Sequence, residues 1–316
     1  MVYKESNILL EITGQRGIAM LYGGIEAGGT KFVCAVGDGN GQIFERVQFP
    51  TTTPKETMKQ VSEFFSQFNL RAIGIGSFGP CDVNSESATY GYITSTPKLS
   101  WRGYPIVKKL EESFNIPIGF STDVNAAALG EVTFGAARGL DSCLYITVGT
   151  GIGAGAVLGG KLLQGLSHPE MGHITVRRHP KDTYPGICPY HKDCLEGLAA
   201  GPAIKERWGK PGVELVNSSE VWEMESYYLA QALVHYILIL SPKKIILGGG
   251  IMKQKQLFPL IYRDVKKLLN KYIELPQLSA EIERYIISPG LGDLAGITGA
   301  LLLGRKAYET QPEKQK

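Results

Sequence analysis

Two glycine-rich segments constrain the fold of this 316-residue chain more than any other feature. The first, GIEAGGTKF, covers residues 24–32, and the second, TVGTGIGAGAV, covers residues 147–157, about 120 positions later. Each places small residues between two β-rich runs, which predicts a tight turn between two strands. Because the segments match in pattern, we interpret them as the starts of two similar α/β halves that arose by internal duplication.

The rest of the chain alternates between strand and helix patterns, which is typical of an α/β protein. A β-rich hairpin is predicted over 21–50, with its turn at Gly37–Gly41. The segment IPIGFST predicts a strand that passes directly into an alanine-rich helix, with Asp123 at the junction. Further apolar or amphipathic runs predict strands at 71–77 and 243–250 and helices at 55–68, 227–240 and 292–308.

The composition excludes several classes of protein. Lysine and arginine number 33 against 30 aspartates and glutamates, so the chain lacks the basic excess that nucleic-acid or membrane surfaces need. No apolar run reaches the roughly 18–20 residues that span a bilayer. Five cysteines and the lack of a signal-peptide pattern indicate reduced thiols, so we expect a cytoplasmic protein without nucleic-acid or membrane partners. Apolar surroundings place Cys34, Cys81 and Cys143 in the core.

The two ends of the chain fit this pattern poorly. Residues 1–19 precede a natural-looking start at Met20, so we interpret them as an extension of uncertain origin. Residues 309–316 form a polar tail, which we expect to be frayed. We therefore assign neither end a function.

The glycine-rich turns suit the binding of phosphate groups. Glycine lets backbone N–H groups approach a phosphate closely, a neighbouring threonine adds a hydroxyl donor, and Lys31 supplies a positive charge. The segments are neither a P-loop nor a dinucleotide-binding fingerprint, because they lack the spacing of the one and the following helix of the other. Tight hairpins alone would also need glycine. Two matching turns and the GGG of residues 248–250 nevertheless favour a nucleotide site.

Four of the five histidines and two of the five cysteines lie within residues 168–197. Thiolate and imidazole groups at spacings such as H-x14-C-x2-H-x2-C suit a tetrahedral Zn²⁺ ion. Four protein ligands would close the site, which indicates a structural rather than a catalytic metal. The alternative is an incidental cluster in a proline-rich loop, and His168 and His179 are weaker candidates than His173. The predicted ligands are His173, Cys188, His191 and Cys194.

Asp123 stands where a predicted strand passes into a predicted helix. In α/β proteins this position exposes functional side chains, and a helix N-terminus favours an ionised carboxylate. An ordinary N-cap would explain an aspartate there equally well. The residues by themselves leave both interpretations open.

The order of the motifs resembles that of the ROK family of sugar kinases and repressors. The motifs are GIEAGGTKF, DVNAAALGE, TVGTGIGAGAV, EMGH, the cysteine–histidine loop and ILGGG, and the resemblance covers residues 20–308. GSFGPCDVN and STPKLSW are most similar to bacterial fructokinases. The resemblance implies two ribonuclease-H-like α/β domains of the actin/hexokinase-like superfamily, with an active-site cleft between them. We expect an N-terminal domain over 20–134, completed by the helix at 293–308, and a C-terminal domain over 135–292 that contains the zinc loop.

The same resemblance implies roles for particular residues around the sugar. Asp123 would be the catalytic base, which accepts the proton of the attacking sugar hydroxyl. Glu170, His173 and Glu196 would bind the other sugar hydroxyls. Thr122 stands where many glucokinases of the family have a sugar-binding asparagine, so the contact with the sugar is expected to differ here.

ATP, Mg²⁺ and a structural Zn²⁺ are the cofactors that the resemblance implies. The third zinc ligand of the family is usually cysteine, and here it is His191. His173 could present one ring nitrogen to zinc and the other to the sugar. The ATP-binding residues would be Gly28, Gly29, Thr30, Lys31, Thr150, Gly151, Pro202, Gly249, Gly250, Ile251, Met252, Lys253 and Gln254.

These expectations favour an ATP-dependent fructokinase that makes fructose 6-phosphate and ADP. We expect a homodimer, although the sequence does not fix the oligomeric state. Alternatives within the family are a glucokinase, a mannokinase or an N-acetylmannosamine kinase. A sugar-sensing repressor is less favoured, because the residues before Gly24 are too few for the three helices of a helix-turn-helix domain. A non-catalytic sugar-binding protein conflicts with the presence of both glycine turns and Asp123.

Overall fold

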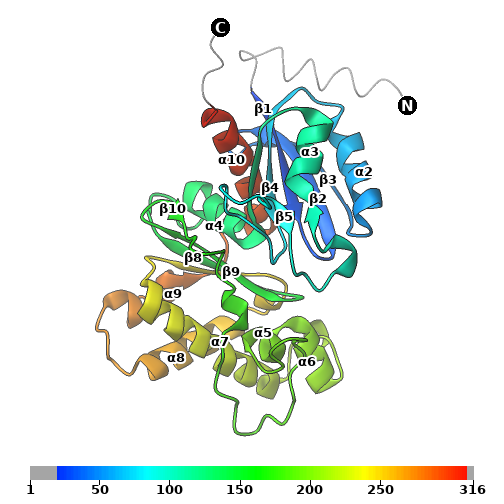
Figure 1. Cartoon of the computed structure of the whole chain (residues 1–316). Coiled ribbons are helices and arrows are strands. Elements are labelled where there is room, and N and C mark those ends of the chain that lie inside the picture. Colours follow the sequence, from blue (N-terminus) through cyan, green and yellow to red (C-terminus); the bar gives the residue numbers. More distant parts are fainter. Residues whose placement is uncertain (1–19, 312–316) are drawn as a thin grey trace. The chain divides into compact units, whose positions relative to one another are not determined.

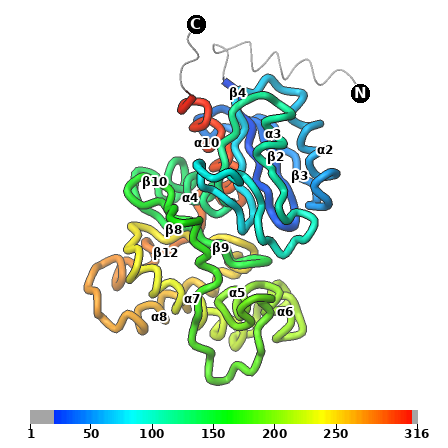
Figure 2. The backbone as a smooth tube through the Cα atoms, in the orientation of Figure 1, coloured from blue at the N-terminus to red at the C-terminus, as the bar shows by residue number. Residues whose placement is uncertain are grey.

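The computed structural model describes residues 20–311, so the extension predicted over 1–19 and most of the tail lie outside the described residues. The chain divides into two compact units. Among the described residues, the first unit consists of 20–126 and 297–311, and the second unit consists of 127–296. The chain traced in Figure 2 therefore leaves the first unit once, forms the second unit, and returns to the first for its final helix.

A five-stranded sheet forms the centre of the first unit, in the order β3-β2-β1-β4-β7. β1, β2 and β3 are antiparallel neighbours, whereas β4 runs parallel to β1 and β7 parallel to β4. The hairpin predicted over 21–50 is thus three strands with two turns, because residues 28–30 also turn the chain. The strands are β1 (Leu21–Ala27), β2 (Lys31–Asp38), β3 (Ile43–Pro50), β4 (Leu70–Ser77) and β7 (Ile118–Thr122).

Helices cover both faces of this sheet (Figure 1). On one face, α2 (Pro54–Phe65) and α3 (Ile106–Phe114) bury Val61 and Leu110 in a core shared with the sheet. On the other face lies α10 (Ala295–Glu309), where the Ala300 carbonyl approaches Gly74 so closely that no Cβ fits. Helix α4 (Asp123–Phe134) follows β7 directly. The remaining short elements are β5 (Tyr92–Ile93), η1 (Leu99–Trp101) and β6 (Tyr104–Pro105).

The second unit has a sheet of the same plan, in the order β10-β9-β8-β11-β12. β8, β9 and β10 are antiparallel neighbours, while β11 is parallel to β8 and β12 to β11. Its strands are β8 (Cys143–Val148), β9 (Ile152–Leu158), β10 (Lys161–Leu162), β11 (Ile245–Gly248) and β12 (Ile286–Ile287). Its helices are α5 (Leu195–Ala199), α6 (Gly201–Trp208), α7 (Ser219–Leu240), α8 (Leu257–Leu269) and α9 (Ile282–Tyr285), with short 3-10 turns η2 (Met171–His173), η3 (Gly212–Glu214), η4 (Ile251–Lys253), η5 (Pro276–Leu278) and η6 (Gly292–Leu294).

The repeated strand order supports the interpretation of two similar α/β halves. In each sheet the first strand of the unit lies at the centre, with its hairpin partner on one side and a parallel strand on the other. The β1–β2 and β8–β9 turns therefore occupy corresponding places in the two sheets. This correspondence makes the two glycine-rich segments structural counterparts.

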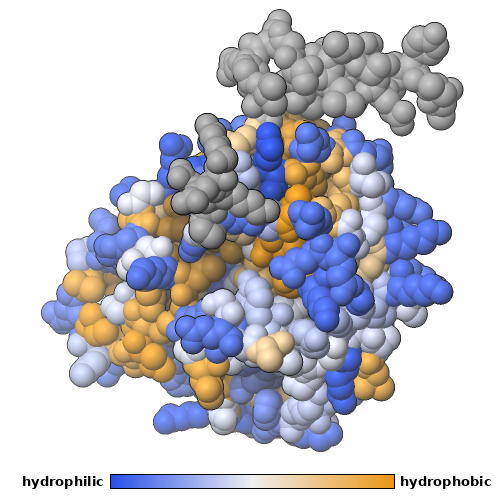
Figure 3. Space-filling model, turned by 45° about the horizontal axis from the view of Figure 1, so that its top comes forward, coloured by the Kyte–Doolittle hydropathy of each residue, from blue (hydrophilic) through white to orange (hydrophobic). Residues whose placement is uncertain are grey.

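Several smaller predictions can also be compared with the structure. Cys34, Cys81 and Cys143 are buried, as their apolar surroundings predicted, and none of the three forms a disulfide. Within residues 20–311, no helix combines the length and apolar character that a membrane span requires. The face shown in Figure 3 carries hydrophobic side chains in several places among hydrophilic ones. Large apolar residues that remain exposed include Leu166, Val213, Ile239 and Tyr272.

Candidate active site

The turn between β1 and β2 has a fixed backbone geometry. The Gly28 N–H donates to the Lys31 carbonyl at 3.0 Å, and a Cβ on Gly28 would lie 2.7 Å from that oxygen, so glycine is required here. Thr51 holds the turn from the side, because its hydroxyl donates to the Gly28 carbonyl at 2.7 Å and its N–H to the Thr30 carbonyl at 2.9 Å. The Lys31 side chain is exposed. A rigid turn that presents glycine amides beside an exposed cation is suited to an anion.

Asp123 is the first residue of α4, and the capping of this helix depends on its neighbour. The Asn125 N–H donates to the Thr122 hydroxyl oxygen at 3.1 Å, which is the bond that an N-cap residue makes with the third residue of a helix. The Asp123 carboxylate accepts a bond from the Val124 N–H at 2.8 Å and is partly exposed. The N-cap interpretation of Asp123 is therefore wrong, since Thr122 fills that role.

Trp101, the last residue of the segment STPKLSW, belongs to the core of the first unit. Its side chain has no exposed surface, and its indole N–H donates to the Thr52 carbonyl at 2.8 Å. The ring packs against Phe32, Phe78 and Tyr104 at centroid distances of 5.3–5.8 Å. Trp101 therefore positions the segment 95–101 rather than lining a ligand site.

Three glycine-containing segments meet at the β8–β9 turn of the second unit. The Gly201 N–H donates to the Gly149 carbonyl at 2.8 Å, which brings the N-terminus of α6 to the turn. A Cβ on Gly149 would lie 3.8 Å from the Gly250 nitrogen, so the segment after β11 also reaches this point. Gly249 has a φ of +90°, and any Cβ there would overlap the Val148 backbone. The structure thus brings together the predicted nucleotide-binding residues around Thr150, Pro202 and Gly250.

The side chains of residues 251–254, which follow the GGG sequence, are less available for contacts with ATP than their position suggests. Ile251 and Met252 are buried in the core, so only their backbone can contact a nucleotide. The Lys253 ammonium is 2.9 Å from the Asp293 carboxylate. The Gln254 side-chain oxygen accepts a bond from the Gln256 amide at 3.1 Å. Contacts from these four residues to ATP therefore stay a prediction.

Two carboxylates lie beside the same turn. Glu196, near the start of α5, accepts a bond from the Ile152 N–H at 2.9 Å, and Gly151 gives it room because a Cβ there would lie 2.6 Å from the carboxylate. The other Glu196 oxygen is 3.9 Å from His173 Nε2. Partial burial and the nearby charge of Glu196 raise the pKa of the Glu170 carboxyl to about 7. The predicted sugar-binding residues Glu170, His173 and Glu196 thus form one cluster.

The four predicted metal ligands also come together, with their ligand atoms within 4.8 Å of one another. His173 Nδ1 lies 3.7 Å from the Cys188 sulfur and 3.5 Å from the Cys194 sulfur, and His191 Nδ1 lies 3.7 Å from the Cys188 sulfur. Zinc bonds of about 2.3 Å to sulfur and 2.0–2.1 Å to nitrogen, at tetrahedral angles, separate such ligands by about 3.6 Å. The donor set and its spacing therefore fit a closed tetrahedral zinc site.

His173 connects the cluster of acids with the cluster of metal ligands. Its Nδ1 faces the two cysteine sulfurs, and its Nε2 is turned towards Glu196. A metal bound at Nδ1 would leave the proton on Nε2, which fixes that nitrogen as a hydrogen-bond donor. His168 and His179 lie outside the ligand group: His168 is buried beside Glu170, and His179 packs on Tyr227.

Sequence reasoning missed two buried carboxylates that hold the second unit together. Glu131, at the end of the motif DVNAAALGE, has no exposed surface and accepts bonds from the N–H groups of Ala136, Gly290 and Leu291 at 2.7–3.0 Å. It ties α4 to the segment that precedes α10. An acidic residue inside an otherwise apolar helix was the signal for this role.

Asp182 anchors the proline-rich loop in the same manner. It accepts bonds from the Tyr184 N–H, the Tyr228 hydroxyl and the Arg207 guanidinium. Burial raises the pKa of the Asp182 carboxyl, but these bonds and the Arg207 charge outweigh burial and keep it below its usual value. No sequence motif marks this residue.

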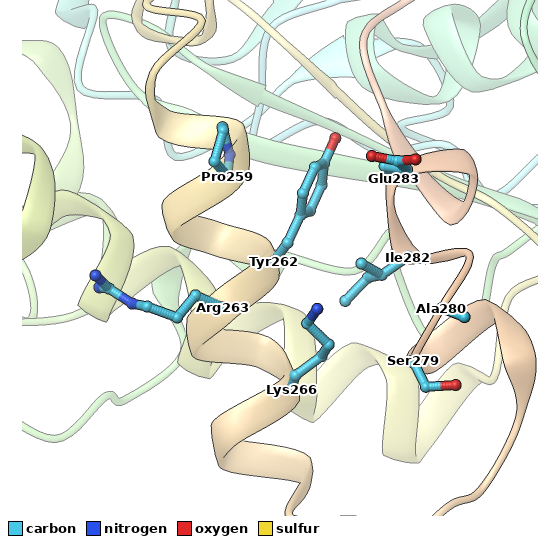
Figure 4. A pocket seen from close by; sticks show the side chains of 8 residues that line it. All are labelled: Pro259, Tyr262, Arg263, Lys266, Ser279, Ala280, Ile282 and Glu283. Carbon is cyan, nitrogen blue, oxygen red and sulfur yellow. The ribbon is translucent and has the colours of Figure 1, made fainter.

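A separate hollow of about 430 Å³ lies between α8 and α9 (Figure 4). Tyr262, Lys266 and Glu283 are among its lining residues. The Arg263 guanidinium at its edge is already bound by the carboxylates of Glu223 and Asp264. Because the hollow contains none of the predicted site residues, we assign it no part in the reaction.

The predicted site residues thus form two groups, one in each unit. The sequence profile of the ROK family matches residues 22–307. The chain belongs to the ROK family. The match covers both groups of residues, from the β1–β2 turn to the final helix.

Comparisons with individual proteins point to one branch of this family. A Bacillus subtilis (strain 168) protein, provisionally named a fructokinase, is 61% identical over 92% of this chain and 97% of its own length. The fructokinase of Pediococcus pentosaceus is 48% identical over 92% of this chain and 99% of its own. Relatives named glucokinase reach only 26–29% identity. This ROK protein is therefore more similar in sequence to these bacterial fructokinases than to these glucokinases.

A solved structure agrees with the fold. The ROK hexokinase of Thermus thermophilus superposes with a TM-score of 0.75 at 28% identity, over 92% of this chain and 100% of the hexokinase. The protein thus has the actin/hexokinase-like fold that its motifs predicted.

Proposed function

We propose that this protein is an ATP-dependent fructokinase, which transfers the γ-phosphoryl group of ATP to the 6-hydroxyl of fructose. The observation that carries the proposal is the identity of 41–61% to relatives named fructokinase, over at least 86% of this chain. The geometry of the two groups of site residues supports a kinase reaction, because each part of phosphoryl transfer has a candidate.

Asp123 is the proposed base. It stands at the first turn of α4, where the helix dipole favours a carboxylate over a carboxylic acid. Thr122 supplies the helix cap, so the position of Asp123 is fixed without using its carboxylate for that purpose. A carboxylate held this way can accept the hydrogen bond of a sugar hydroxyl, align its oxygen with the phosphorus atom and take its proton.

ATP, entering as its Mg²⁺ complex, is proposed to bind through the two glycine turns. In the first unit, Gly29, Thr30 and Lys31 are proposed to contact the phosphates. Gly28, whose N–H donates to the Lys31 carbonyl, is proposed to shape the turn. In the second unit, the β8–β9 turn lies beside the N-terminus of α6, where the helix dipole also favours an anion. Pro202 and residues 249–254 flank the adenosine in this proposal.

Glu170, Glu196 and His173 are proposed to hold the sugar. Hydroxyl groups both donate and accept hydrogen bonds, and this set offers two carboxylates and one imidazole N–H. Zn²⁺ would be held by His173, Cys188, His191 and Cys194, where it stabilises the loop rather than taking part in the reaction. The family's asparagine is replaced by Thr122, whose hydroxyl oxygen already caps α4, so we propose a sugar contact at this position that differs from that of the glucokinases.

We also propose that the protein acts as a homodimer in the cytoplasm, where ATP is available. The exposed apolar residues of the second unit, such as Ile239 and Tyr272, support an association between copies. The nearly balanced charge of the chain supports a small-molecule substrate rather than a nucleic acid.

The substrate proposal is tested by comparing kcat/KM for a panel of hexoses with ATP. Fructose should give the highest value, with glucose well behind, because a site that hydrogen-bonds particular hydroxyls penalises a sugar that leaves them unpaired. Mannose and N-acetylmannosamine complete the panel. If glucose or N-acetylmannosamine wins, the substrate is wrong while the kinase reaction stands; if no hexose is phosphorylated, the kinase proposal fails as well.

A further inference from the structure

We infer that Lys98 is a second cation of the first glycine turn and contacts the phosphoryl group while it passes from ATP to the sugar. The inference deepens the proposed function and rests on it. It concerns a residue of the segment STPKLSW, which the assignment of site residues left without a role.

The position of Lys98 is the first observation. A Cβ placed on Gly29 would lie 3.3 Å from the Lys98 Cε atom, and nothing else lies within 4 Å of that point. The carbon that bears the ammonium group is therefore the neighbour of the β1–β2 turn. Lys31 directly follows this turn in the sequence, so two lysines lie next to residues 28–30.

Lys98 is also held in place by buried residues. Its N–H donates to the hydroxyl of Thr96, which is 1% exposed, and its carbonyl accepts a bond from the N–H of Trp101. The Trp101 indole in turn donates to the Thr52 carbonyl. Thr51, the preceding residue, is the one that clamps Gly28 and Thr30. The segment Thr51–Thr52 thus contacts both the glycine turn and the residues that hold the Lys98 backbone, which places Lys98 beside the turn.

The ammonium group has no protein anion to neutralise it. Among residues 20–311, no carboxylate lies within 4.0 Å of the Lys98 ammonium, although the side chain is half-buried. Other lysines of the chain, such as Lys109, Lys243 and Lys253, do have such a partner. An ammonium group that no carboxylate neutralises can form charge-assisted hydrogen bonds with an anionic ligand. This arrangement points to an anionic ligand.

The surrounding groups narrow the ligand to a phosphoryl group. Glycine amides and ammonium groups only donate hydrogen bonds, whereas a sugar hydroxyl needs acceptors as well. Such donors match the oxygens of a phosphoryl group, which arrives on ATP and leaves on the sugar phosphate. Donors that face the oxygens of the phosphoryl group during its transfer stabilise the transition state more than they stabilise bound ATP or bound sugar phosphate.

The test compares Lys98→Met with Lys98→Arg, and uses Lys55→Met as the matched control. Lys55 is exposed at the start of α2, outside the proposed site. Lys98→Met should lower kcat by about 10²–10³-fold, as the loss of one preorganised donor does elsewhere. The KM for fructose should change by less than about threefold, because no sugar hydroxyl loses a partner. Lys98→Arg should recover part of the loss, and Lys55→Met should match the unmodified enzyme.

Two binding measurements identify the source of the phosphoryl group. Calorimetry with ATP in the absence of sugar reports the nucleotide, and inhibition by fructose 6-phosphate reports the product. Weaker binding of either ligand to Lys98→Met supports the inference. It is overturned if kcat, ATP affinity and product inhibition all stay within about twofold of the unmodified enzyme. A rise in the KM for sugar alone also overturns it, because Lys98 would then contact a hydroxyl.

The design separates this inference from the substrate proposal. If another hexose is preferred, the same variants are compared on that hexose, and the ATP measurement needs no sugar at all. If Lys98→Met does not fold, as judged by circular dichroism, Lys98→Gln replaces it because its shorter polar side chain still lacks the charge.

Discussion

At the scale of single residues, Thr122 and Asp123 divide two roles that one aspartate could have filled. Thr122 is 4% exposed and caps α4, while Asp123 at the next position is partly exposed. This division separates the stability of the helix from the proposed chemistry. Loss of the cap at Thr122 should cost about 1 kcal/mol of folding free energy. A change at Asp123 should cost little stability and much activity.

Asp123→Asn is therefore expected to remain folded and to lose turnover. Asparagine cannot take the hydroxyl proton, so kcat should fall by about 10²–10⁴-fold, the usual contribution of a general base. The KM for fructose should move far less, because the lost interaction belongs mainly to the transition state. Steady-state kinetics measure both values, with circular dichroism as the check on folding and Asp141→Asn, an exposed aspartate outside the site, as the control. A variant that keeps more than about a tenth of kcat would contradict the assignment of the base.

Glu225 offers a prediction that concerns stability alone. It lies on α7, is 1% exposed, and neither carboxyl oxygen has a hydrogen-bond partner in the described part of the chain. Burial raises the pKa of the Glu225 carboxyl well above its usual value, although the nearby Arg207 charge opposes this. The folded state then keeps a proton that the unfolded state loses above pH ~4.3, so stability falls as pH rises from there.

Glu225→Gln should remove that dependence. Relative to the variant, the unmodified protein should lose up to about 1.4 kcal/mol of unfolding free energy per pH unit as the pH rises above ~4.3. Denaturant unfolding at several pH values measures the difference, and Glu220→Gln, at an exposed position of the same helix, is the control. Parallel stability curves for Glu225→Gln and the unmodified protein would show that this carboxyl ionises in the fold.

At the scale of elements, the loop over 168–197 depends on side chains rather than on regular secondary structure. An ion pair between Asp182 and Arg207 holds the middle of the loop, and the cluster of cysteines and histidines brings its end together. The loop carries Glu170 and His173, so its order controls the proposed sugar contacts. A metal held here would couple folding to the binding of sugar without entering the reaction.

The purified protein should contain about one zinc ion per chain. Cys188→Ser or Cys194→Ser should lose the metal, lower the melting temperature and weaken the binding of fructose, because zinc binding contributes to folding. His191→Cys should keep the metal, since it restores the ligand usual in the family. Cys143→Ala, a change in the core far from the ligand group, should also keep it. Elemental analysis and thermal unfolding are the measurements; a zinc-free protein with unchanged melting would refute the site.

The elements also show what the sequence can and cannot predict. The two glycine turns, and the closeness of His173, Cys188, His191 and Cys194, could be predicted because the spacing of glycines and of cysteine and histidine residues is a local pattern. Helix α7 begins at Ser219, earlier than the predicted 227, because Glu225 and Ser226 are buried polar residues that interrupt its apolar pattern. The partners of Glu131 at 290 and 291 were not predictable, since they are backbone groups brought together only by the fold. The same holds for the neighbourhood of Gly29 and Lys98.

At the scale of the whole molecule, the two sheets share one strand order but have acquired different attachments. The first unit has the helix cap at Thr122 and the lysine at position 98. The second unit has the loop over 168–197, which carries the predicted metal ligands and Glu170, and also Glu196 at the start of α5. Each sheet has a glycine turn at the same place, as an internal duplication would produce. In the proposed function, both turns contact the phosphates of one nucleotide.

The last helix, α10, has a consequence for how the chain is made. The second unit is continuous in sequence, whereas the sheet of the first unit stays uncovered on the face of Gly24, Gly74 and Gly119 until residues 297–309 exist. During synthesis from the N-terminus, the second unit can finish folding while the first still exposes that apolar face. A ribosome that stalls before α10 therefore releases a chain with one complete unit and one aggregation-prone sheet.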